Sequence, residues 1–299
     1  NNKIMKKLIL SIFLLCTGGI LSAQNSQNNP LKIIAFGAHP DDCDAKFGGT
    51  AALYAQMGHK VKFVSLTNGD AGHQSEGGGF LGKRRRAEAK KAGKILNITY
   101  DVLDNHDGEL MPTLQVRHQV IRKIREWDAD IVLGLRPNDY HPDHRNAGII
   151  VQDAAYLVIV PNVTPDTAPL KKNPVFLYMK DNFKKPTPFS KDIAIIIDTV
   201  VDQKIKALAA HSSQMFEWLP WVSGVEKKEI PTNEIDRLAW LKKKYSTQII
   251  WSEENIALLK KWYPKVKNTS VKYLEFFEIC EYGKQPNTSE IKKLFPMLK

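Results

Sequence analysis

Two short polar clusters contain the residue types needed for metal-assisted hydrolysis. The first, HPDD, spans residues 39–42, and the second, HPDH, spans residues 141–144. Two imidazoles and one carboxylate drawn from them would form a three-ligand metal site with open positions, the arrangement of catalytic zinc. The remaining acidic and imidazole groups would be free to accept a proton from a water and to stabilise negative charge on an attacked oxygen.

Each cluster alone has a simpler interpretation, because a His-Pro-Asp sequence after a strand is commonly a turn whose Asp caps the next helix. The chemistry therefore depends on the two clusters meeting. The first directly follows the apolar run 31–38 (LKIIAFGA), and the second follows 131–135 (IVLGL) after a short loop. If these are neighbouring parallel strands, as a first and a fourth strand commonly are, the clusters face each other at the sheet edge where ligands bind.

The elements that must position the clusters alternate between strand and helix. Continuous apolar runs are typical of buried parallel strands, and apolar residues at helical spacing separate them. We predict the following elements: strands at 31–38, 60–67, 100–103 and 131–135, helices at 44–58, 83–96, 113–127 and 143–160, and a glycine-rich loop at 68–82. This order predicts an α/β fold with a Rossmann-like, doubly wound and mostly parallel sheet.

The second half of the chain is less regular. Strands are expected at 175–179 and 193–197, and a helix at 200–210. The segment 218–267 is rich in Trp, Pro and Lys and does not divide into clear elements, whereas 273–282 (YLEFFEICEY) is a late strand or helix packed on the core. We predict one domain over residues 25–299, with a C-terminal elaboration of the main fold.

The N-terminal residues predict export. Met5 and two lysines precede the apolar stretch 8–21, and small residues follow at 22–24, which is the three-part pattern of a signal peptide. The residues before Met5 are interpreted as upstream sequence. The apolar stretch is too short to span a bilayer comfortably, and no other segment is apolar enough to do so. We expect a signal peptide ending at residue 24 and a periplasmic or extracellular protein.

Composition sets few further limits. Hydrophobic residues make up 43% of the chain, as in ordinary globular proteins, and the formal net charge is +11. The charge indicates a solvated basic surface or, alternatively, attraction to an acidic polymer such as an anionic glycan. No nucleic-acid-binding module is visible, so DNA and RNA are not expected as partners.

Removal of the leader would leave two cysteines, Cys43 and Cys280. Because Cys43 lies inside the proposed site, we predict two free thiols and not a disulfide. We also expect Cys43 to pack in the core and not to bind metal.

The chain resembles the PIG-L/LmbE-like family of zinc-dependent N-acetylglucosaminyl de-N-acetylases. The family motifs AHPDDxE and HPDH match residues 38–44 and 141–144, and the similarity runs from residue 31 to about 214. One departure is Asp44, where the family has Glu; this shorter carboxylate can still cap the helix or support the ligands. The resemblance implies that one zinc ion, or another divalent metal, is held by three residues: His39, Asp42 and His144.

The resemblance also assigns roles to residues beside the metal. Asp41 would be the general base, His141 would stabilise the oxyanion, and Asp143 would orient His141. Arg85, in the RRAE segment after the glycine-rich loop, and Asp107, in DNHDGEL, would contact the substrate. Both have a structural alternative: Arg85 would pair with Glu88 on a helix surface, and Asp107 would be a turn residue.

These implications describe an exported enzyme that removes the N-acetyl group from an amino sugar or its glycoconjugate, releasing acetate and a free amine. A free sugar, an oligosaccharide and a polymer all remain open as substrates, and the oligomeric state is unknown. Trp218, Trp221 and Trp240 would stack on sugar rings or belong to the core. The alternatives are a non-haem iron enzyme with two His and one carboxylate, and a glycan-binding member without activity.

Overall fold

The computed structural model describes residues 29–246, 248, 251–267 and 270–298. The expected signal peptide at residues 1–24 therefore lies outside the described residues. Within them, no helix has both the length and the apolar character needed to cross a bilayer.

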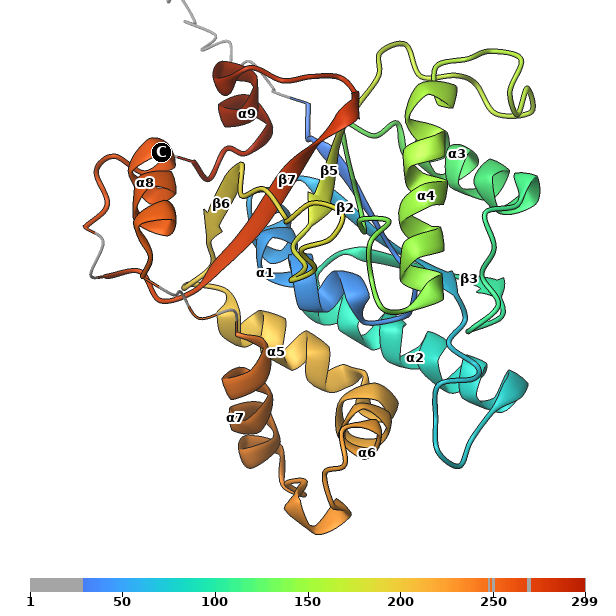
Figure 1. Cartoon of the computed structure of the whole chain (residues 1–299), viewed down its shortest axis with the longest axis vertical. Coiled ribbons are helices and arrows are strands. Elements are labelled where there is room, and N and C mark those ends of the chain that lie inside the picture. Colours follow the sequence, from blue (N-terminus) through green and yellow to red (C-terminus); the bar gives the residue numbers. More distant parts are fainter. Residues whose placement is uncertain (1–28, 247, 249–250, 268–269, 299) are drawn as a thin grey trace, which may run out of the picture.

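The described residues form a seven-stranded sheet with the order β3-β2-β1-β4-β5-β7-β6 (Figure 1). Strands β1 to β5 pair in parallel, and β7 lies antiparallel between β5 and β6. The strands have these bounds: β1 Lys32–Gly37, β2 Lys60–Thr67, β3 Thr99–Asn105, β4 Ile131–Gly134, β5 Val175–Met179, β6 Ile193–Ile196 and β7 Leu274–Gly283. The predicted α/β fold with a mostly parallel sheet is confirmed, and β1 pairs with β4 as the site requires.

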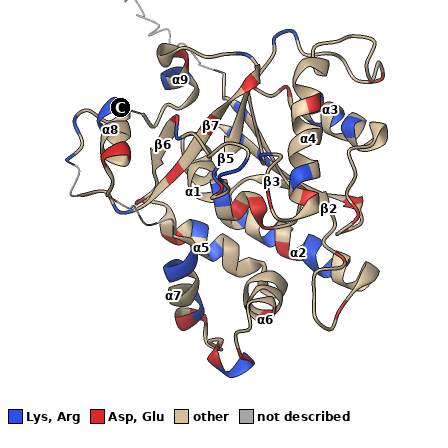
Figure 2. Ribbon diagram, in the orientation of Figure 1, with Lys and Arg blue, Asp and Glu red and all other residues tan. Residues whose placement is uncertain are grey.

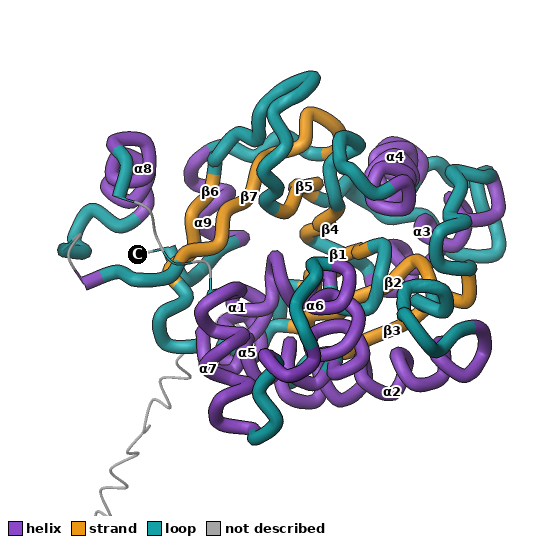
Figure 3. The backbone as a smooth tube through the Cα atoms, turned by 60° about the horizontal axis from the view of Figure 1, so that its bottom comes forward, coloured by secondary structure: helices purple, strands orange, loops and turns teal. Residues whose placement is uncertain are grey.

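Helices cover both faces of the sheet, as Figure 3 shows. One layer contains α1 (Asp42–Gln56), α2 (Gly78–Leu96) and α5 (Val201–Ala210), and the opposite layer contains α3 (Leu114–Trp127) and α4 (Pro142–Leu157). The sheet is thus buried on both sides, which explains the continuous apolar runs of its central strands.

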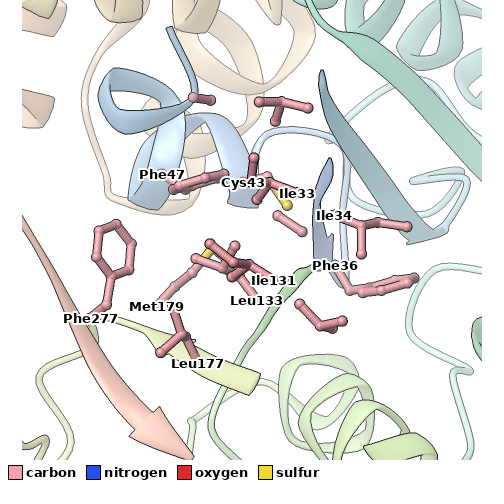
Figure 4. Packing of buried hydrophobic residues seen from close by; sticks show 14 of the residues in the cluster. Ile33, Ile34, Phe36, Cys43, Phe47, Ile131, Leu133, Leu177, Met179 and Phe277 are labelled. Carbon is pink, nitrogen blue, oxygen red and sulfur yellow. The ribbon is translucent and has the colours of Figure 1, made fainter. Parts of the chain in front are cut away.

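The core between α1 and the sheet contains the predicted free thiol. Cys43 and Phe47 of α1 lie above sheet side chains such as Ile33, Leu133 and Phe277 (Figure 4). Cys43 is 1% exposed, and both it and Cys280 are buried and unpaired. The prediction of two free thiols, with Cys43 as a packing residue, is confirmed.

Helix α2 begins earlier than predicted, at Gly78 and not at residue 83. The cluster of glycines there was interpreted as loop, and this was wrong for residues 78–82. Glycine lowers helix propensity, but the first turn of a helix needs partners for its N–H groups more than it needs side chains. The Gly78 amide donates to the Asp70 carbonyl oxygen at 2.8 Å, which anchors this turn to the preceding loop.

The segment that the sequence left undivided contains short helices: α6 (Leu219–Val222), α7 (Glu234–Tyr245) and α8 (Glu253–Trp262), followed after β7 by α9 (Thr288–Leu294). The choice of strand or helix for 273–282 is settled in favour of strand β7. Its Glu275 ties the sheet to two helices, because it accepts hydrogen bonds from Lys204 of α5 at 2.8 Å and from the Gly49 and Thr50 amides of α1 at 2.9 and 2.7 Å. The C-terminal strand thereby holds the helix that follows the first polar cluster.

Candidate active site

The two polar clusters meet at the carboxyl edge of β1 and β4. Helix α1 begins at Asp42 directly after β1, and α4 begins at Pro142 after the β4 loop. The His39 ring centroid lies 4.7 Å from that of His141 and 5.1 Å from that of His144. The turn requires Gly37, since a Cβ atom there would come within 2.7 Å of the Asp42 Cβ. The convergence predicted from the sequence is present.

The three predicted metal ligands have the spacing of a metal site. His39 Nδ1 lies 3.2 Å from His144 Nε2, His144 Nε2 lies 3.3 Å from Asp42 Oδ1, and His39 Nδ1 lies 3.8 Å from Asp42 Oδ2. Zinc bound tetrahedrally by nitrogen at 2.0–2.1 Å separates its ligand atoms by about 3.3 Å. The donor set of two imidazoles and one carboxylate therefore fits a zinc-like ion in both chemistry and spacing.

The far side of each imidazole faces a carboxylate. His39 Nε2 lies 2.9 Å from Asp107 Oδ1 and 3.3 Å from Asp143 Oδ2, and His144 Nδ1 lies 3.2 Å from Asp139 Oδ2. Burial alone would lower the pKa of His39, but its contacts with Asp107 and Asp143 raise it to about 10. Nε2 faces two carboxylates, so Nδ1 is the nitrogen directed at the other ligands, and a bound metal would displace the proton from Nδ1.

Asp139 was not singled out from the sequence. Besides lying against His144, its carboxylate accepts a hydrogen bond from the His141 amide at 3.0 Å. It thus positions both histidines of the second cluster. The only signal in the sequence was an acidic residue just before HPDH, in NDYHPDH.

Asp107 was expected to contact the substrate, but in the structure its carboxylate contacts other protein groups. Its Oδ1 faces His39, its Oδ2 accepts from the Gly72 amide at 2.9 Å, and Arg85 Nη1 lies 3.5 Å away. Burial would raise the pKa of Asp107, but His39 and Arg85 hold it well below its usual range. Asp107 lines the cavity, so it combines orientation of His39 with access to a ligand.

Arg85 is 1% exposed and is not part of a helix-surface ion pair. Its guanidinium donates to the Gly69 carbonyl oxygen at 2.6 Å and to the Gln214 side chain, and it lines the cavity. Glu88 is instead bound by Ser213, whose hydroxyl donates to it at 2.6 Å. The alternative of an Arg85–Glu88 pair is therefore wrong.

The carboxylate of Asp143 serves His39 and not His141. It accepts from the Gly108 amide at 2.7 Å and lies 3.3 Å from His39 Nε2. Its backbone amide is what meets His141, donating to Nδ1 at 3.2 Å. The expected orienting role toward His141 thus rests on the main chain at the start of α4, where His141 is the N-cap residue.

Asp41 stands apart from these contacts. Its backbone has a φ of 138°, a conformation that residues with a side chain rarely adopt, and its amide donates to the Tyr100 hydroxyl at 3.2 Å. Gln214 Nε2 donates to its Oδ2 at 3.3 Å. Burial and the adjacent charge of Asp42 raise the pKa of Asp41 to about 7. A buried carboxyl group poised near neutral pH suits a general base.

A cavity of about 210 Å³ joins these groups. The aromatic and apolar part of its lining is formed by Tyr140, Met215, Trp218, Leu219 and Tyr245. Trp221 stacks on Trp218 with ring centroids 5.4 Å apart and is 56% exposed, whereas Trp240 packs against Phe216. Of the three tryptophans noted in the sequence, Trp218 is the one that lines the cavity.

The sequence and the fold resemble those of known proteins. A model of the GlcNAc-PI de-N-acetylase (PIG-L) family matches residues 34–155. The diacetylchitobiose deacetylase of Thermococcus kodakarensis is 31% identical over 205 residues, which are 65% of this chain and 74% of that protein. The chain belongs to the PIG-L family.

Two further comparisons bear on this family member. The structure of the N,N'-diacetylchitobiose deacetylase from Pyrococcus horikoshii superposes with a TM-score of 0.63 at 23% identity, covering 84% of each chain, and shows the shared fold. The 4-oxalmesaconate hydratase of Pseudomonas putida is 23% identical over 205 residues, covering 66% of this chain and 79% of that protein. Because these relatives differ in reaction, the activity must be argued from the site residues.

Proposed function

We propose that this protein is an exported, zinc-dependent de-N-acetylase that removes the acetyl group from an N-acetylated amino sugar or its glycoconjugate. The observation that carries the proposal is the position of Asp41. It is a buried carboxyl group beside the predicted ligands His39, Asp42 and His144, and it remains available to move a proton. The similarity to a diacetylchitobiose deacetylase supports an N-acetyl sugar as the substrate.

Zinc held by His39, Asp42 and His144 would supply Lewis acidity at the acetyl group. Asp41 would accept a proton from the attacking water and return it to the departing amine, so one carboxyl group acts first as base and then as acid. A pKa near 7 permits both steps at neutral pH. The products are acetate and a free amino sugar.

His141 would donate a hydrogen bond to the oxygen that becomes negatively charged. Its Nδ1 accepts from the Asp143 amide, so a neutral ring carries its proton on Nε2. Burial and the neighbouring rings of His39 and His144 lower the pKa of His141, which favours that neutral form. Nε2 of His141 is then the nitrogen that donates the hydrogen bond, because the contact at Nδ1 fixes the tautomer.

The test is the release of acetate from N-acetylglucosamine, from N,N'-diacetylchitobiose and from longer chitooligosaccharides. We expect release without oxygen and loss of activity on treatment with a zinc chelator. Absence of acetate from the whole panel would refute the proposed activity. Dependence on oxygen would favour the iron enzyme, and binding without turnover would favour the glycan-binding alternative.

Trp218, in the aromatic part of the cavity lining, is expected to contribute to sugar binding. Trp218→Ala should raise KM for an N-acetyl sugar about fivefold to tenfold, the effect of losing one stacked aromatic contact, with a smaller change in kcat. Steady-state kinetics provide the measurement. The matched control is Trp251→Ala, since Trp251 is 44% exposed and does not line the cavity. An equal change in KM in both variants would show that Trp218 does not contribute to sugar binding.

Export has its own test. The mature protein should begin near Asn25, because small residues at 22–24 follow the apolar stretch. N-terminal sequencing of material secreted by the producing cells gives the answer. Secreted protein that retains residues 8–21 would contradict the proposal of a cleaved signal.

A further inference from the structure

A second cavity lies beside the active-site cavity, and we call it the lysine cavity after Lys46, Lys180 and Lys191 in its wall. Its volume is about 460 Å³, and Lys180 enters it directly after the carboxyl end of β5. Ala45, on the first turn of α1, lines both cavities. Since β1, β4 and β5 are parallel neighbours, the two cavities occupy the same edge of the sheet, where ligands bind in such folds.

The acidic side chains in this wall are already paired. Each faces a basic partner at these N–O distances: Arg136–Asp181 2.6 Å, Lys204–Glu275 2.8 Å and Lys191–Glu254 2.5 Å. None of these three carboxylates forms an ion pair with Lys46 or Lys180.

Lys46 and Lys180 have no ion-pair partner among the described residues, although both are half-buried. Lys180 Nζ and Lys191 Nζ lie 5.9 and 5.4 Å from the centroid of the Phe276 ring, so the two ammonium groups share one aromatic ring. Burial, and then the neighbouring charge of Lys191, lower the pKa of Lys180. Half-buried ammonium groups that repel each other would be stabilised by an anion.

The lysine cavity adjoins the active site through α1. Lys46 directly follows Ala45, the residue that lines both cavities. Figure 2 shows basic and acidic residues together on helices such as α7 and α8. The lysine cavity instead contains two lysines without an ion-pair partner among the described residues, next to the active-site cavity.

We propose that the lysine cavity binds an anionic substituent, a carboxylate or a sulfate or phosphate ester, on the sugar unit next to the one that is deacetylated. The substrate is then an acidic glycan. This inference rests on the proposed function and narrows its substrate class. Ammonium groups bind such oxygens through charge-assisted hydrogen bonds.

The test compares two disaccharides that contain the same N-acetylglucosamine unit, one linked to glucuronic acid and one linked to glucose. The wild-type protein should show a kcat/KM about tenfold higher for the acidic disaccharide, the effect of one charge-assisted hydrogen bond. The advantage should shrink at high salt because screening weakens charge attraction. Equal rates for the two disaccharides would overturn the inference, whereas no acetate from either would refute the deacetylase itself.

Variants locate the effect. Lys180→Met keeps an unbranched apolar stem and removes the charge, so the ratio of kcat/KM for acidic over neutral disaccharide should fall toward one, mainly through KM. Lys46→Met is a second variant with the same expectation. Lys90→Met is the control, because Lys90 is exposed on α2, outside the lysine cavity, and its loss changes the net charge equally. A similar fall of this ratio in Lys90→Met would show that the preference for the acidic disaccharide comes from the net charge of the protein and not from the lysine cavity.

Competition with inorganic sulfate distinguishes a cavity that binds a substituent of the substrate from a cavity that binds a free anion. Millimolar sulfate should compete with the acidic disaccharide and leave hydrolysis of the neutral one unchanged. If sulfate altered the rate with the neutral disaccharide and Lys180→Met removed that response, the cavity would be a site for a free anion and the inference would be wrong.

Discussion

Asp41→Asn should lower kcat by about 10²–10⁴-fold, equivalent to about 3–5 kcal/mol of transition-state stabilisation, while the protein retains its zinc. Asn is nearly isosteric with Asp, so the substitution adds no steric conflict to the φ of 138° already present at this position, and the turn should survive. What Asn lacks is the capacity to take a proton from water. Turnover kinetics with an N-acetyl sugar, together with metal analysis of the same preparation, measure both parts of this expectation.

Asp42→Asn is the matched comparison, because it makes the same chemical change at the next residue. Asp42 Oδ2 accepts from the Ala38 and His39 amides at 2.9 and 2.8 Å, and its other oxygen faces His144. Loss of its charge should weaken zinc retention. If Asp41→Asn lost zinc and Asp42→Asn kept it, the two roles would have to be exchanged.

Replacement of a predicted ligand should have the second large effect. His39→Ala and His144→Ala each remove one of three ligands, so zinc content and acetate release should both fall to near background after dialysis. Metal analysis gives a readout independent of activity. Full zinc occupancy in both variants would contradict the ligand assignment.

Asp139→Asn provides a graded version of the same experiment. Its carboxylate lies behind His144, and loss of such a partner typically weakens metal affinity or activity about 10–100-fold. Zinc affinity measured by competition with a chelator should therefore be intermediate between wild type and His144→Ala. A zinc affinity equal to that of the wild type would show that Asp139 does not support His144 and only accepts the hydrogen bond from the His141 amide.

The sequence was sufficient for the main sheet and for the meeting of the two clusters. Strands β1, β4 and β5 are apolar runs with clear ends, and their identity follows from local pattern alone. The start of α2 was placed too late because glycines usually mark loops, whereas here a carbonyl oxygen of the preceding loop anchors the first turn. The 273–282 segment remained ambiguous because an apolar run of that length fits either element until its partners are known.

The supporting residues of the site could not be read from the sequence for a physical reason. Gln214 reaches Asp41 across 173 positions of chain, and no local pattern marks such a contact. Arg85 and Asp107 were expected at the substrate, but burial directs both toward protein groups as well. Residue type and spacing marked the two clusters and the family resemblance predicted the ligands within them, while their partners depend on the tertiary packing.

The insertion of β7 between β5 and β6 has a consequence for the order in which the chain can fold. Strand β6 pairs in the sheet with β7, and Glu275 of β7 binds both α1 and α5, yet β7 starts only at Leu274. A nascent chain that has emerged as far as β6 therefore lacks the strand that completes its sheet and fixes the helix beside the HPDD cluster. Such long-range pairing slows folding. In an unfinished polypeptide, β6 and the Glu275 contacts of α1 and α5 would therefore be completed only after β7 has been synthesised.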